Sequence, residues 1–274
     1  MPTEADAIAQ CTKPRTREGI AHDLLDLGLQ EGMTVLVHSS LSSLGWVCGG
    51  PVTVIQALMD VVTDKGTIVM PAMSPGNSDP MLWHNPPVPG EWKEIIRATM
   101  PAFDPLVTPA RGMGITAEVF RTWPGTVRSA HPSTSFAARG SHADDVVRDH
   151  KLDNCLGETS PLARLYDLDA AVLLLGVGYD CNTCFHLSEY RAPGARSVTE
   201  GSAVMIAGQR TWTTYTDIEL HEERFMQIGT AFEQTGAVRV GYVGSAQSRL
   251  FKERAAVDFA VRQIVRAREE TEAS

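Results

Sequence analysis

The chain has no paired cysteine framework, no long apolar run and no excess of positive charge. Its five cysteines are an odd number, which is typical of reduced thiols. No stretch approaches the ~18 apolar residues that a membrane span needs, and the N-terminal segment has no apolar secretion core. These absences predict a cytoplasmic protein with no membrane partner.

The net charge and the composition narrow the class of protein further. The net charge of -9 argues against nucleic acid as the main partner. Hydrophobic residues make up 43% and charged residues 21% of the 274 positions, as in an ordinary globular protein. An acidic surface would suit a polycationic ligand, although solubility alone explains most acidic surfaces. The length suffices for one large α/β domain or two intimately packed ones.

The stretch from Ala170 to Tyr190 carries the clearest local signal. Six apolar residues from Ala170 predict a buried strand, which a glycine-containing turn follows. His186 and Glu189 then come at i and i+3, on one face if the segment is helical. A helix starting near Thr183 would place His186 in its first turn, where the helix dipole disfavours imidazolium. We expect His186 to be a general base; the alternative is an ordinary core histidine.

A carboxylate on the other ring nitrogen would fix the tautomer of such a base. Glu189 is one candidate, and the acidic segment after the next pair of strands supplies others. That segment contains Asp217, Glu219, Glu222 and Glu223. A solvated charged surface is the alternative interpretation of the segment.

A second strand–loop–helix pattern lies near the start of the chain. Residues 33–38 predict a buried strand, and a loop rich in serine and glycine leads from it to a helix opened by Pro51. Free backbone N–H groups at a helix N-terminus can seat a phosphate. The loop matches neither the Walker A nor the GxGxxG pattern. The alternative interpretation is an ordinary connection between a strand and a helix that binds no phosphate.

The other patterns predict one α/β domain over residues 17–274, preceded by a loosely ordered tail over 1–16. We expect helices at 16–27, ended by Gly28, and at 249–267. Residues 203–207 and 211–216 predict a hairpin. Residues 73–108, rich in proline and glycine, predict a functional loop.

Metal and redox chemistry find little support in the spacing. Cys181 and Cys184 form a CxxC pair, but no second pair completes a zinc site and the flanking residues are not thioredoxin-like. His186, Glu189, His221 and Glu222 could be a metal set, yet no HExxH spacing is present. No GxSxG elbow indicates a serine hydrolase. We expect no metal.

Several linked motifs carry a resemblance to a known family. In chain order they are VHSSLSSLG, RSAHPSTSFAARG, SPLARL, LLLGVGYDCNTCFHLSEY and an acidic segment ending in EERF. Together, over roughly residues 16–225, they resemble the aminoglycoside 3-N-acetyltransferase (antibiotic N-acetyltransferase) family. The resemblance implies a non-GNAT acetyltransferase fold, a central sheet with helices packed on both faces. It also implies acetyl transfer from acetyl-CoA to the 3-amino group of a 2-deoxystreptamine ring, and hence antibiotic resistance.

The resemblance also implies site residues. His186 matches the catalytic histidine, Glu219 the acidic residue paired with it, and Thr183 a third member. Asp217, Glu189 and Asp180 are the candidates for binding the substrate. The cofactor-binding candidates are His38, Ser39, Ser40, Leu41, Ser42, Ser43, Arg128, His131 and Ser135. The cysteines that flank CNTC depart from the varied residues expected there.

The expected mechanism is direct transfer, because a free amine is already a good nucleophile. The expected partner is a polycationic aminoglycoside, and the chain is a monomer or a homodimer. Two rivals remain open: an acetyltransferase acting on another small amine, and an acyl-CoA-binding protein without catalysis. A metallohydrolase is a third interpretation and the least favoured of the three.

Overall fold

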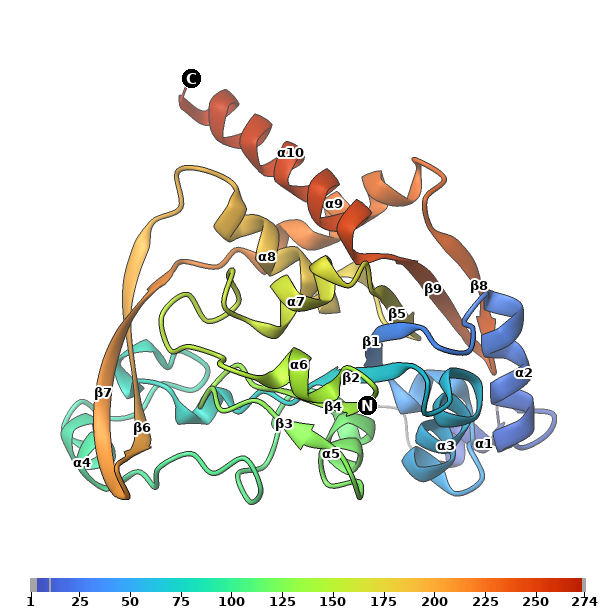
Figure 1. Ribbon diagram of the computed structural model, residues 1–274, viewed down its shortest axis with the longest axis horizontal. Helices are drawn as coiled ribbons and strands as arrows, with labels where there is room; N and C mark the ends of the chain where they lie inside the picture. Colours follow the sequence, from blue (N-terminus) through green and yellow to red (C-terminus); the bar gives the residue numbers. More distant parts are fainter. Residues whose placement is uncertain (1–3, 10, 273–274) are drawn as a thin grey trace.

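The computed structural model describes residues 4–9 and 11–272, and its centre is a mixed seven-stranded sheet (Figure 1). The strand order across the sheet is β3-β4-β2-β1-β5-β9-β8. In that order the strands are Val127–Arg128, Phe136–Gly140, Thr67–Pro71, Thr34–Ser39, Ala171–Leu175, Ala246–Lys252 and Arg239–Val243.

The three central strands β2, β1 and β5 run parallel to one another. The outer strands β4 and β9 pair antiparallel with β2 and β5. All five residues of both β2 and β5 are buried, as expected for strands covered on both faces.

Helices cover both faces, so the expected fold is confirmed. Along β1, Leu36 faces one core, and Val35 and Val37 face the other, because successive side chains of a strand alternate. The first core contains residues of α6, α7, α8, α9 and α10, and the second contains residues of α2, α3 and α5. The helices are α1 Glu4–Ala9, α2 Arg17–Leu27, α3 Gly50–Val62, α4 Trp92–Thr99, α5 Gly114–Arg121, α6 Ala143–Val147, α7 Pro161–Asp167, α8 Cys184–Arg191, α9 Phe225–Glu233 and α10 Glu253–Glu272.

A separate two-stranded sheet stands at one side of the molecule. Its strands, β6 (Ser197–Ile206) and β7 (Gln209–Ile218), form a long antiparallel hairpin that runs from the end of α8 towards α4 (Figure 1). The predicted hairpin is confirmed and extends further than the pattern indicated.

Two helix predictions have different outcomes. The helix ended by Gly28 is confirmed: Thr16 caps α2, and Gly28 takes the left-handed conformation with φ 108°. The helix predicted over 249–267 is wrong at its start. Residues up to Lys252 belong to strand β9, and the helix begins at Glu253.

Some segments were not anticipated in detail. Within 73–108 the structure contains helix α4, and within the predicted tail it contains α1; residues 1–3 and 10 lie outside the described part. Over residues 4–9 and 11–272, none of the helices is long and apolar enough to cross a membrane.

Candidate active site

The carboxyl ends of β1 and β5 bring two connections together at one edge of the sheet. The loop after β1 leads to α3 on one face, and the loop after β5 leads to α8 on the other. The amide of Ser40 donates to the carbonyl of Leu175 at 3.0 Å and ties the loops together. Gly176 is required there, because a Cβ would lie 2.9 Å from Cβ of Ser43 and φ is +70°. Such a switch point is where open α/β sheets place their ligands.

Helix α8 presents a histidine and a glutamate at this edge. It begins at Cys184, with Thr183 as its N-cap, so His186 lies in the first turn as predicted. Nδ1 of His186 is 2.7 Å from Oε2 of Glu189, whose side chain is 3% exposed. Oε1 of Glu189 accepts the amide of His221 at 2.7 Å. Since the carboxylate accepts on both oxygens, we assign the proton to Nδ1, which leaves Nε2 of His186 free to accept another.

A second imidazole lies near the first. His38, on β1, is close enough to His186 for their charges to interact, and burial followed by that interaction lowers the pKa of His38 to about 3. His38 is therefore neutral near pH 7. Its Nε2 is buried and makes no hydrogen bond within the part of the chain that the structure describes. The rings of His186 and Phe225 pack edge to face, with centroids 4.8 Å apart.

Comparisons with known proteins identify the family of the chain. Residues 36–264 match the family described as Aminoglycoside 3-N-acetyltransferase. The Bacillus subtilis (strain 168) protein named SPbeta prophage-derived aminoglycoside N(3')-acetyltransferase-like protein YokD is 52% identical, covering 92% of this chain and 93% of that protein. Aminoglycoside N(3)-acetyltransferase VII of Streptomyces paromomycinus is 39% identical, covering 90% and 91%. The chain belongs to the aminoglycoside 3-N-acetyltransferase family.

Solved structures of the family superpose on nearly the whole chain. The crystal structure of YokD from Bacillus subtilis has a TM-score of 0.94 at 50% identity, covering 95% of this chain and 97% of that chain. A structure titled AAC-IIIb binary with CoASH has a TM-score of 0.83 at 33% identity, covering 93% and 98%. AAC-VIa bound to sisomicin has a TM-score of 0.84 at 31% identity, covering 92% and 98%. The chain is therefore an acyltransferase of this family.

The structure places the two glutamates predicted near His186 differently. Glu189, which we expected among the substrate-binding residues, holds the ring. Glu219, expected as the partner of His186, pairs with Arg196 at 3.6 Å and is 44% exposed. The backbone carbonyl of Thr183 accepts the amide of His186 at 3.0 Å, and the Thr183 side chain forms no capping bond. The catalytic roles of Glu219 and Thr183 remain predictions.

Asp217 and Asp180 were expected to meet the substrate. Asp217 is 3% exposed, and its carboxylate already accepts three donors: the Tyr190 hydroxyl at 2.5 Å, the Ile218 amide at 2.8 Å and the Cys155 amide at 3.2 Å. This geometry makes Asp217 a tie between the hairpin and α8. Asp180 is exposed in the loop before α8, and its contact with the substrate remains a prediction.

Three predicted cofactor residues are bonded within the chain. Arg128 donates to the carbonyls of Ala72 and Thr108 and to the Ser135 hydroxyl, and it lies over the Phe103 ring. Burial lowers its pKa to about 10. Ser135 is fully buried and donates to Ala72. These contacts fasten the 73–108 segment to the sheet, and a direct contact with the cofactor remains a prediction.

His131, the third, is also fully buried. Its Nδ1 accepts the Thr134 amide at 3.1 Å, and Nε2 lies 3.3 Å from the Leu152 carbonyl. Burial lowers the pKa of His131 to about 4. The ring therefore supports the turn between β3 and β4 as a neutral group.

The serine loop is held in part by its own hydrogen bonds. The Ser43 hydroxyl donates to Ser40 Oγ at 2.8 Å, and residues 41–44 form a short 3-10 helix. Gly49 and Gly50 then enter α3 with φ of +83° and +58°. The amide of Gly50 already donates to the Val47 carbonyl at 3.0 Å, and a phosphate contact at this helix N-terminus remains a prediction.

One part of the site gave no signal in the sequence. Arg224 and Arg268 line a small cavity together with Glu189 and His221. Arg268 comes from α10, more than seventy residues after Glu189, so no spacing rule links them.

Among the described residues no group of three or more histidines, cysteines or carboxylates is placed to hold a metal, and all five cysteines are free.

Proposed function

We propose that the chain transfers the acetyl group of acetyl-CoA directly to the 3-amino group of the 2-deoxystreptamine ring of an aminoglycoside, with His186 as the general base. The observation that carries the proposal is the 2.7 Å contact between Nδ1 of His186 and Glu189 at the switch point of the sheet. A base held by a buried carboxylate needs no covalent intermediate when the nucleophile is an amine.

The path of the transferred proton follows from the tautomer of His186. Nε2 of His186 accepts a proton from the amine as the amine nitrogen bonds to the thioester carbonyl carbon. The bond between that carbon and sulfur then breaks, and His186 returns the proton to the leaving thiolate. Glu189 stabilises the positive charge that the ring carries in between.

The polar groups around His186 have separate tasks. His38 is neutral and lies beside the base, so its ring can donate an N–H to the oxygen that becomes negative. The Ser40–Ser43 loop and the N-terminus of α3 would hold the CoA portion; CoA is bound by the relative AAC-IIIb, whose fold this chain shares. Aminoglycosides are polycations, and sisomicin is bound by the relative AAC-VIa. The net charge of -9 favours their capture.

Release of CoA thiol from acetyl-CoA tests the proposal. We expect turnover with sisomicin and none with sisomicin already acetylated on its 3-amine. His186→Ala should lower kcat by ~10²–10⁴, the usual contribution of a general base. A stable acetyl-enzyme, detected by mass spectrometry after incubation with acetyl-CoA alone, would contradict direct transfer. Thiol release with another small amine but not with sisomicin would replace the acceptor and keep the chemistry.

A further inference from the structure

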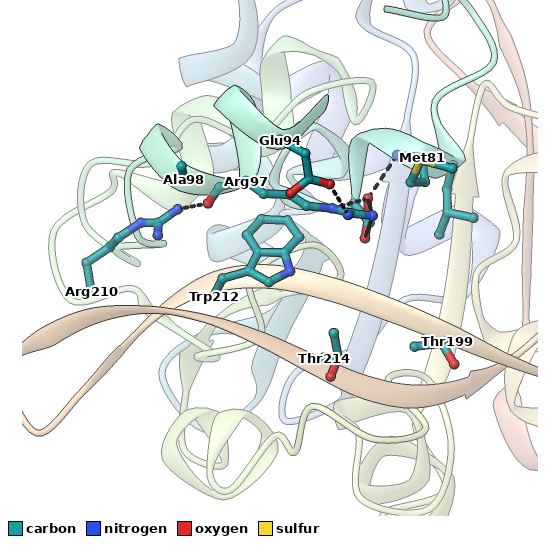
Figure 2. A pocket seen from close by; sticks show the side chains of 10 residues that line it. Met81, Glu94, Arg97, Ala98, Thr199, Arg210, Trp212 and Thr214 are labelled. Carbon is teal, nitrogen blue, oxygen red and sulfur yellow. Dashed lines mark hydrogen bonds and ion pairs between the residues drawn. The ribbon is translucent and has the colours of Figure 1, made fainter. Parts of the chain in front are cut away.

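A hollow separate from the paired His186 and Glu189 lies between α4 and the β6–β7 hairpin. Its volume is about 650 Å³, and its walls come from α4, the hairpin and the 3-10 helix Pro80–Leu82 (Figure 2). We call it the hairpin hollow. Such a volume lies within the range of small-molecule sites. No residue in it was singled out by a motif.

The charges in the hairpin hollow cancel one another. Arg97 donates to Asp79, with a shortest distance of 2.8 Å, and to Glu94 at 2.7 Å. Arg210 donates to the carbonyls of Met100 and Arg97 at the end of α4. Two carboxylates and two guanidinium groups therefore face the hollow, each already occupied. Because these charges balance, the hollow carries no excess of either sign, and a ring that enters it would be held mainly through its uncharged groups.

The hollow does offer an aromatic ring. The indole of Trp212 lies between the hairpin and Arg97 of α4 (Figure 2). Gly201 makes room for it on the neighbouring strand, because a Cβ at Gly201 would be 2.9 Å from Cζ2 of the indole. Met81 and Leu82 add apolar surface.

Unused hydrogen-bonding groups accompany this surface. The hydroxyls of Thr199 and Thr214 line the hollow. Neither hydroxyl, nor Nε1 of Trp212, has a hydrogen-bond partner among residues 4–9 and 11–272. An aromatic face with neutral donors and acceptors suits a ring with an apolar C–H face and a hydroxylated edge.

We propose that the hairpin hollow binds a sugar ring. The inference rests on the proposed function, so the ring belongs to the aminoglycoside and is not the one that is acetylated. The hairpin that forms one wall of the hollow is also bonded to helix α8. Tyr190 follows Glu189 and donates to Asp217 of β7, and the neighbouring Thr216 is the strand partner of Thr199 in the wall. A substrate of several rings can extend along the hairpin from α8 into the hollow.

The test compares acceptors of different length. For Trp212→Ala we expect kcat/KM with the three-ring sisomicin to fall by about tenfold, the effect of losing one aromatic contact of ~1.4 kcal/mol. With 2-deoxystreptamine alone as acceptor, kcat/KM should be unchanged, as should KM for acetyl-CoA. Trp212→Phe should recover most of the loss, and Thr214→Val should show a smaller loss of the same selectivity. Trp92→Ala, on α4 outside the hollow, is the control and should match wild type.

Three outcomes would overturn the inference. Equal losses with both acceptors would mean that Trp212 only supports the hairpin. A loss confined to KM for acetyl-CoA would assign the hollow to the nucleotide of CoA. Unchanged kinetics in Trp212→Ala would show that the hollow binds no ring of the acceptor.

Equilibrium binding separates this inference from the proposed function. Sisomicin binding is measured by calorimetry on wild type and Trp212→Ala. Binding that depends on Trp212 without any turnover would keep the hollow as a sugar site and refute the acetylation. Turnover with sisomicin that does not depend on Trp212 would keep the acetylation and refute the hollow.

Discussion

Glu189 holds the imidazole of His186 from one turn further along the same helix, with 2.7 Å between Oε2 and Nδ1. The other oxygen of Glu189 accepts the amide of His221, which comes from the segment after the hairpin. The pair is thus fixed both within α8 and across the fold. Because the carboxylate is 3% exposed, water screens the contact weakly.

The first prediction distinguishes Glu189 from Glu219. Glu189→Gln keeps the shape of the side chain but removes the charge that stabilises the protonated ring, so kcat should fall by roughly 10²-fold or more. Glu219→Gln is the matched control. Its carboxylate is 44% exposed and paired with Arg196, so we expect a change of less than about threefold. The reverse ranking in a thiol-release assay would restore Glu219 as the partner of the base.

The second prediction concerns the packing of α9 against the loop before α8. A Cβ at Gly229 would lie 1.9 Å from Cγ of Tyr179. Alanine normally favours a helix, yet here it must displace a buried tyrosine. We expect Gly229→Ala to lower the free energy of unfolding by about 1–3 kcal/mol and Tm by roughly 5 °C.

Gly90→Ala is the control for this substitution, because nothing lies within 4 Å of the added Cβ and its φ is not positive. Thermal unfolding followed by circular dichroism measures both variants. Equal Tm values for Gly229→Ala and wild type would show that Tyr179 does not constrain α9. Since Tyr179 lies in the loop that leads to His186, a fall in kcat is expected together with the loss of stability.

The sequence predicts most strongly where a pattern is local. The buried run of β5, the spacing of His186 and Glu189, and the glycine that ends α2 each depend on neighbours along the chain, and each is present in the structure. Of the two central strands that carry the site, β5 is apolar throughout and β1 is apolar from Val35 to Val37. Their own apolar residues suffice to predict these strands without knowledge of the strands that pair with them.

The predictions that failed or stopped short depend on distant contacts. Leu250 and Phe251 continue the apolar positions of α10, so the pattern merged them with the helix; pairing with β5 makes them part of β9. Helix α4 carries a short apolar stripe, with Trp92, Ile95 and Ile96 at i, i+3 and i+4. None of its residues is buried, and the surrounding stretch is rich in proline and glycine, so the stripe did not stand out from a loop. The same reason explains why Glu219 ranked above Glu189 in the sequence: the pairing of a carboxylate with His186 is decided in space.

The third prediction is an effect of salt on substrate capture. With a net charge of -9, the chain attracts a polycation over distances that salt screens, since the Debye length is ~8 Å at physiological ionic strength and shorter above it. KM for sisomicin should rise about three- to tenfold between 0.05 and 0.5 M NaCl. KM for the anionic acetyl-CoA should not rise in parallel and serves as the control. A KM for sisomicin that is independent of salt would refute the electrostatic account.

The fourth prediction follows from Glu200 on the hairpin. Burial, then the charges of Asp217 and Asp79, raise the pKa of Glu200 from 4.5 to about 7. Below pH 4.5 the group is protonated in both the folded and the unfolded chain, and its contribution to stability is fully present. As pH rises towards 7 the unfolded chain loses the proton first, so this contribution is lost across that window.

Glu200→Gln should remove this dependence on pH. At pH 8 the variant should be more stable than wild type by about 1 kcal/mol, a value reduced for solvent screening at this partly buried site, and Tm should rise by roughly 2 °C. At pH 4.5 the two proteins should unfold at the same temperature, which makes the acid measurement an internal control. A constant difference in Tm from pH 4.5 to 8 would assign the effect to packing. A wild-type chain whose stability does not fall relative to the variant between these pH values would show that Glu200 is not held in its protonated form.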